Sequence, residues 1–148
     1  SDKMTDIPFN FSSVPSTWAL CFNENCPKKA ICMRHFAAQH LPADRKIGLA
    51  VYPNALQKNK CEYFVEKRIV RAAWGFRKLL LNVKYKDEAQ LRYEMKQFLG
   101  GHSAYYRYMN GKLTLLPELQ EGILHLFREH GYTEDLVFDN YINRYVYE

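Results

Sequence analysis

Four cysteines place the strongest constraint on how this chain can fold. Cys21, Cys26 and Cys32 follow the spacing C-x4-C-x5-C, and Cys61 comes after 28 further residues. In a chain without an evident export signal, four thiols indicate a metal site before they indicate disulfides. We therefore expect the segments that carry these cysteines to converge on one ion.

Zinc is the metal that fits these residues best. It takes four thiolate or imidazole ligands in a tetrahedron, and a shell closed by four thiolates leaves no position open for catalysis. The predicted site is therefore structural, with His35 or His40 as an alternative ligand. An iron–sulfur cluster also takes four thiolates, and the pair Cys26-Pro27 occurs in ferredoxin patterns. A third interpretation is four inert or paired cysteines, because free cysteine is among the residues most often buried.

The composition limits the kinds of protein that this chain can be. The chain has no run of 18 apolar residues, so we expect no membrane span. We interpret Met4 as the natural start; no signal peptide is visible there, and we expect a cytoplasmic protein whose thiols stay reduced. Aromatic residues reach 15%, with eleven tyrosines, which is typical of half-buried surfaces and contact faces.

Charge is distributed unevenly along the chain. Residues 1–61 carry eight Lys/Arg against four acids, and residues 62–112 carry eleven against five. Residues 113–148 carry two against seven, which makes the tail acidic. A basic middle can attract nucleic-acid phosphates, or it can serve only to keep the surface solvated.

The pattern of apolar residues predicts a single α+β domain over 1–148, with a Cys-rich half 1–83 and a helical half 84–148. A small sheet is expected near 47–83. Periodicity in 68–83 fits both a helix and a strand, and we favour a strand for part of it. The other predicted elements are helices at 30–41 (carrying Cys32), 87–99, 102–109 and 118–130, strands at 7–11, 47–52 and 61–65, and a helix or strand within 134–147.

A short basic and aromatic stretch follows Gly100-Gly101. Residues 87–131 resemble the helix-turn-helix region of phage-repressor-like DNA-binding domains, whose short second helix enters the major groove. That likeness implies DNA or RNA contact through Ser103, Tyr105, Arg107 and Lys112. The alternative is that the tyrosines at helical spacing pack in the core and that Arg107 faces water.

Catalytic motifs are missing from the sequence. It contains no Gly-rich phosphate loop, no G-x-S-x-G and no H-E-x-x-H. We therefore expect a non-catalytic binding protein that contacts nucleic acid. The alternatives are an adaptor that docks another protein through its tyrosine-rich surface, and an enzyme whose site leaves no linear motif.

Several short motifs together resemble one family. They are Trp18-x-x-Cys21, Cys26-Pro27, Cys32-x-Arg34, Val51-Tyr52-Pro53-Asn54, Cys61-x-Tyr63-Phe64, Gly75-Phe76 and His102-x-x-Tyr105-Tyr106-Arg107. In this order they are similar to an uncharacterised family from Bacteroides relatives, classified only as a domain of unknown function. The resemblance spans most of the chain and implies no activity.

Overall fold

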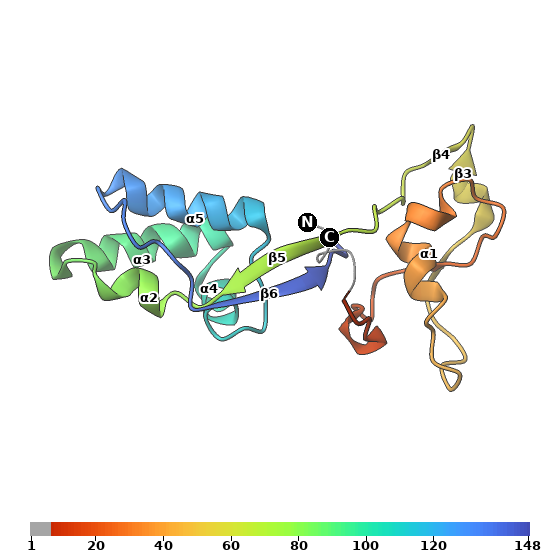
Figure 1. Cartoon of the computed structure of the whole chain (residues 1–148), viewed down its shortest axis with the longest axis horizontal. Helices are drawn as coiled ribbons and strands as arrows, with labels where there is room; N and C mark the ends of the chain where they lie inside the picture. The colour runs from red at the N-terminus through yellow and green to blue at the C-terminus, as the bar shows by residue number, and fades with distance from the viewer. Residues whose placement is uncertain (1–6) are drawn as a thin grey trace. The chain divides into compact units, whose positions relative to one another are not determined.

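The structure, a computed structural model, describes residues 7–148 and has an α+β fold. Within these residues the chain forms five α-helices and three two-stranded sheets, which confirms the predicted fold class. It divides into two compact units (Figure 1). Unit 1 is the chain up to Ile69 together with Tyr145–Glu148, and unit 2 is Val70–Arg144.

Unit 1 is built from very short elements. Strands β1 and β2 pair in parallel, with Cys21 opposite Val51. Strands β3 and β4 form a hairpin in which Leu56 lies opposite Cys61. Its two turn residues, 58–59, both have positive φ, which is typical of a type I′ turn. In chain order the elements are η2 (Phe11–Ser13), β1 (Leu20–Cys21), η3 (Lys29–Ile31), α1 (Met33–Ala38), β2 (Ala50–Val51), η4 (Pro53–Ala55), β3 (Leu56–Gln57) and β4 (Lys60–Cys61), where η denotes a 3₁₀ helix.

Two small clusters of buried side chains form the core of unit 1. One contains Met33, Tyr145 and Tyr147, and the other contains Leu20 with two alanines of α1. The end of the chain therefore belongs to this unit, and the backbone N–H of Val146 donates to Arg68 O at 3.3 Å. Because each cluster is small, apolar burial gives unit 1 a modest stability of its own.

Unit 2 has one larger core, lined by its helices. The buried side chains include Phe76, Leu91, Tyr105, Ile123 and Phe127. The chain enters along β5 and leaves along β6, which pair and point in opposite directions (Figure 1). The elements are β5 (Ile69–Trp74), α2 (Arg77–Leu81), α3 (Tyr85–Leu99), α4 (His102–Met109), α5 (Pro117–Glu129) and β6 (Asn140–Tyr145).

The long elements agree with the sequence predictions. Helices α3, α4 and α5 lie within two residues of their predicted bounds. The ambiguous stretch 68–83 contains both structures, because β5 ends before Gly75 and α2 follows it. The tail forms a strand, β6. None of the helices in the described part of the chain combines the length and hydrophobicity needed to cross a bilayer.

The short elements need correction. Cys32 was predicted to lie on a helix, but it is the N-cap of α1 and has extended backbone angles, so it lies just before the helix. The strand predicted at 47–52 is reduced to β2, because Ile47 is 88% exposed and has no strand to pair with among the described residues. Of the strand predicted at 61–65, only Cys61 lies in a strand (β4), and residues 62–63 form a turn; residues 7–10 form no element. The compact units also differ in bounds from the halves 1–83 and 84–148.

Candidate functional site

The four cysteines come from four different parts of unit 1. Cys21 ends β1, Cys26 lies in the loop that follows, Cys32 caps α1 and Cys61 ends β4. All four are free thiols; Cys32 is buried and the others are half-buried. Local backbone bonds shape two of these segments, because Cys26 O accepts from Lys29 N–H and Cys61 O accepts from the N–H three residues later.

The side chain of Arg34 braces three of the cysteine segments. Its Nη1 donates to Ala19 O and its Nε donates to Tyr63 O, both at 2.7 Å. Its guanidinium also stacks over the Trp18 ring at 4.5 Å. Ala19 precedes Cys21 by two residues, and Tyr63 follows Cys61 by two. Since Arg34 itself lies two residues after the third cysteine, its bonds draw the three segments together.

Electrostatics shows that the fourth thiol belongs to the same group. Burial is the main cause that raises the pKa of Cys21, and the charges of Cys32, Cys26 and Cys61 raise it further. A hydrogen bond from the Asn23 backbone acts in the opposite direction. Each of the other three thiols therefore lies within electrostatic range of Cys21. Ionised together, they would repel, unless a cation between them compensated the charge.

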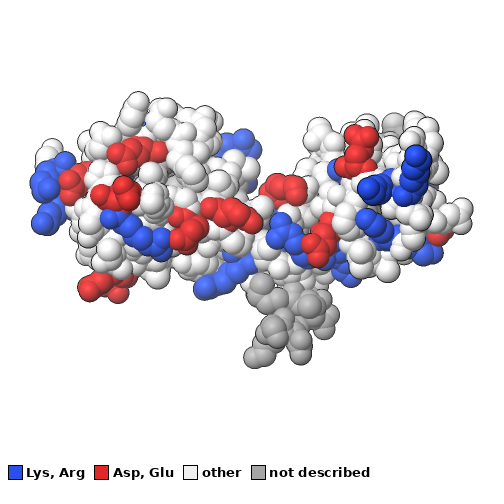
Figure 2. All heavy atoms as spheres, turned by 90° about the horizontal axis from the view of Figure 1, so that it is seen from above, with Lys and Arg blue, Asp and Glu red and all other residues white. Residues whose placement is uncertain are grey.

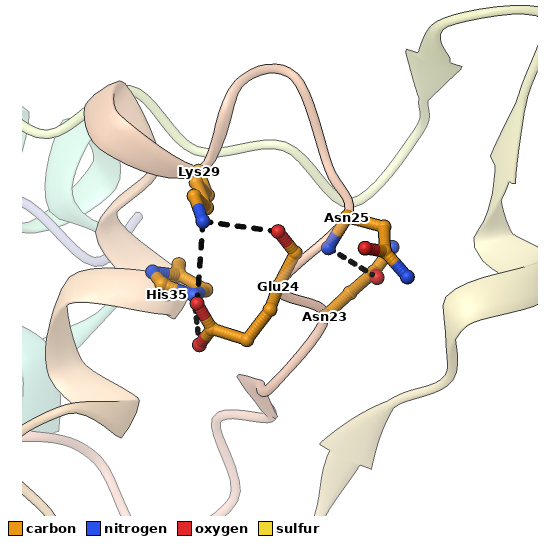
Figure 3. A network of polar contacts seen from close by, with 5 residues as sticks. All are labelled: Asn23, Glu24, Asn25, Lys29 and His35. Atoms are coloured by element: carbon orange, nitrogen blue, oxygen red, sulfur yellow. Dashed lines mark hydrogen bonds and ion pairs between the residues drawn. The ribbon is translucent and has the colours of Figure 1, made fainter.

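A polar network anchors the loop that carries Cys26 (Figure 3). His35 of α1 is 3% exposed, and its Nε2 lies 3.0 Å from Glu24 Oε2. The Lys29 ammonium contacts Glu24 twice, through a side-chain oxygen at 3.3 Å and the backbone oxygen at 3.0 Å. The hydrogen bond with His35, followed by that with Lys29, holds the pKa of Glu24 below its ordinary value. The loop is thereby tied to α1.

The predicted metal site is only partly assembled. Within residues 7–148, no group of three or more His, Cys, Asp or Glu side chains is close enough to hold a metal ion. The alternative histidine ligands have other partners: His35 pairs with Glu24, and His40 Nδ1 lies 2.9 Å from Phe36 O. The thiols are neighbours without being in coordination geometry, and zinc and iron–sulfur remain predictions.

In unit 2, the predicted nucleic-acid residues divide into two groups. Ser103 and Arg107 on α4, and Lys112 after it, are exposed. Tyr105 is fully buried, with its ring 5.3 Å from that of Phe76, and its hydroxyl accepts from an arginine of α3 at 3.4 Å. Burial raises the pKa of Tyr105. Its ring is therefore part of the core and cannot stack on a base in this structure.

The basic middle is partly neutralised when unit 2 folds. This unit contains eleven Lys/Arg and nine Asp/Glu, because it includes both the basic stretch before 113 and most of the acidic residues after it. At the start of α2, the Asp139 carboxylate accepts the backbone N–H groups of Arg77 and Lys78, at 2.9 and 2.7 Å. On the face in Figure 2, acidic and basic side chains are interspersed.

Sequence reasoning missed an open pocket in unit 1. Its volume is about 780 Å³, and its walls include Trp18, Arg34, Tyr52, Asn54 and Tyr63. The signal was present in the motifs Trp18-x-x-Cys21 and Cys61-x-Tyr63, where aromatic residues flank cysteines at short spacing. The same loops that carry the thiols therefore carry the aromatic walls of the pocket.

Comparison with known proteins identifies one family. A family of unknown function (DUF6078) matches residues 3–147, which is nearly the whole chain. No curated protein and no solved structure matches it. The predicted membership of an uncharacterised family is thus confirmed, whereas the likeness to helix-turn-helix domains and the origin among Bacteroides relatives stay predictions.

Proposed function

The chain belongs to the family of unknown function (DUF6078), whose description names no activity. From the geometry of the chain itself we propose that it is a non-catalytic binding protein, held together near its N-terminus by a structural zinc ion, which we call the zinc staple. The proposed ligands are the thiolates of Cys21, Cys26, Cys32 and Cys61. The observation that carries this proposal is the brace formed by Arg34, which holds three of the four cysteine segments together through backbone oxygens. Thiolate sites need a reducing compartment, so we propose a cytoplasmic location.

The charge balance of such a site supports the proposal. Four thiolates around Zn²⁺ carry a net charge of about 2−, given one negative charge per ligand. The guanidinium of Arg34 is a positive charge beside them. Burial lowers the pKa of Arg34, whereas the negative charges of Cys32, Cys61 and Cys21 raise it by favouring the charged guanidinium. Groups of this kind, next to the ligands, commonly stabilise metal sites.

Coordination requires the thiols to move closer together. Cys26 lies in a loop, Cys32 caps α1, and Cys61 is the last residue of β4, so rotation about χ1 can redirect each of these sulfurs without disturbing a helix. Metal binding commonly completes the folding of small domains, with free energies of about 10–16 kcal/mol in zinc-finger peptides. A unit with two small cores and two-residue strands is the kind of unit that needs such a staple.

Elemental analysis of the purified full chain tests this proposal. We expect about one zinc per chain, because the shell has four ligands and one ion. Cys61→Ser should lose the zinc and lower the unfolding midpoint, whereas His40→Ala, which removes an alternative ligand, should keep the zinc. Iron with visible absorbance would favour the cluster instead. A zinc-free wild-type protein that tolerates Cys61→Ser without loss of stability would support inert cysteines and contradict the proposal.

A second candidate function is nucleic-acid binding through α4. The observation that favours it is the exposure of Ser103 and Arg107 on a short helix that follows the Gly100-Gly101 turn, and of Lys112 just after that helix. These side chains can donate to phosphate oxygens, as in helix-turn-helix domains. In this proposal Tyr105 supports the helix from the core and makes no contact with the ligand.

A further inference from the structure

The pocket of unit 1 has walls that share one chemical character. Tyr52 is 72% exposed and Tyr63 is 46% exposed, and both line the pocket beside the half-buried ring of Trp18. Exposed aromatic rings are costly to leave in water and offer flat faces for stacking. The pocket that they help to line has a volume of about 780 Å³, which is enough space for a planar group.

The polar groups in the pocket are available for a ligand. Among the described residues, the side-chain amide of Asn54 has no hydrogen-bond partner, and Lys60 forms no ion pair. Two nitrogens of Arg34 are occupied by backbone oxygens, which leaves Nη2 without a partner in the described part of the chain. An amide offers both a donor and an acceptor. The lining also contains one carboxylate, that of Glu62, so the two cations leave a net positive charge that suits a phosphate.

We infer that this pocket binds unpaired nucleotides of single-stranded nucleic acid. A base stacks between the exposed tyrosines, its edge meets the amide of Asn54, and the adjoining phosphate meets Lys60 and Arg34. Stacking on aromatic side chains beside cationic groups is how proteins hold single strands with little sequence preference. The bases of a duplex are already stacked and paired, so a duplex cannot enter in this way.

The inference rests on the proposed zinc staple. Cys21, Cys32 and Cys61 each lie within two residues of a pocket-lining residue: Ala19, Arg34 and Lys60, respectively. A metal that fixes these three cysteines would also fix three walls of the pocket. Removing the metal should therefore weaken binding even though no pocket residue touches the ion.

The test is fluorescence anisotropy with the zinc-loaded full chain. The probes are labelled uridine RNA and thymidine DNA strands of about ten nucleotides, and a duplex of the same length. We expect the single strands to bind. Tyr52→Ala or Tyr63→Ala should raise the dissociation constant by about tenfold, because each substitution removes the stacking of one base. The control Tyr85→Ala removes a tyrosine that is 96% exposed in unit 2 and should bind like wild type.

Three results would overturn the inference. The first is a duplex that binds as tightly as the single strands. The second is binding that falls with Arg107→Glu while both pocket variants bind like wild type, since that assigns the ligand to α4. The third is zinc at about one per chain with no binding to any strand, which rejects the pocket alone. Absence of zinc from the wild-type protein would instead reject the proposed staple, on which this inference rests.

Discussion

Gly75 stands at the junction of β5 and α2, where only glycine fits. Its φ is +88°, its N–H donates to Tyr108 O at 3.0 Å, and its carbonyl accepts from Asp139 N–H at 3.1 Å. A Cβ placed there would lie 2.6 Å from Asp139 Oδ2. Since that carboxylate caps the start of α2, the glycine allows strand, helix and cap to meet at one point.

We predict that Gly75→Ala lowers the free energy of unfolding by about 3 kcal/mol, the sum of backbone strain and a displaced cap. Chemical denaturation measures the change. The matched control is Gly100→Ala, where φ is +99° but no atom lies within 4 Å of the added carbon. The control should lower the free energy of unfolding by only about 1 kcal/mol, because it adds backbone strain at a positive φ and no close contact. Equal losses in the two variants would show that contact with Asp139 is unimportant.

At the residue scale, the sequence was informative about chemistry and weak about exposure. Cysteine spacing marked the segments that the structure brings near one another. The sequence shows Gly75 only as part of the motif Gly75-Phe76, because its carboxylate neighbour Asp139 lies 64 residues further on. Tyr105 was one of four predicted contacts, yet it is buried; helical spacing fits both a core face and a contact face, and only packing against Phe76 separates them.

Among the helices, α3 depends on a residue outside it for its first turn. The hydroxyl of Tyr132, after α5, accepts the backbone N–H of Lys84 at 3.1 Å and donates to the Asp87 carboxylate. The same bond is the main cause that lowers the pKa of Asp87 and raises that of Tyr132. Lys86 and His130 add smaller favourable charge effects on Asp87.

This contact predicts a pH-dependent stability. The folded pKa of Asp87 lies below its ordinary 3.8, so the bond to Tyr132 stabilises the fold above about pH 4 and is lost as the pH falls through the lowered value. Tyr132→Phe should therefore lower the unfolding midpoint at neutral pH, and the difference from wild type should shrink in acid. Tyr85→Phe serves as the exposed control. A difference that stays constant from neutral to acidic pH would contradict this role.

Elements differed in how far the sequence could predict them. Helices α3, α4 and α5 have long periodic patterns, an acidic first turn or a glycine stop, and these signals are local. The two-residue strands have no such signal: β1 pairs with β2 across about 30 residues, and pairing at that distance depends on the tertiary fold. Cys32 was placed on a helix because its neighbours have helical spacing, although its own backbone is extended.

At the scale of the whole molecule, the chain leaves unit 1 at residue 69 and returns to it at 145. The sequence indicated a Cys-rich half and a helical half but set their boundary at residue 83. The boundary falls earlier because Ala73, Phe76 and Leu79 belong to the core of unit 2. The return of Tyr145 and Tyr147 to Met33 is a contact across more than 100 residues, which no local pattern reveals.

The two units also differ in what stabilises them. Unit 2 has one extended core of aromatic and aliphatic side chains, whereas unit 1 has two small clusters and three thiols within electrostatic range of Cys21. We propose that an ion adds to the stability of unit 1 and steadies the walls of the pocket beside the cysteines.

The most direct measurement is X-ray absorption at the zinc edge on the purified full chain. The account predicts a first shell of four sulfurs at about 2.3 Å, supplied by Cys21, Cys26, Cys32 and Cys61. Zinc surrounded only by oxygen or nitrogen, or a folded chain that takes up no zinc when it is supplied, would contradict it.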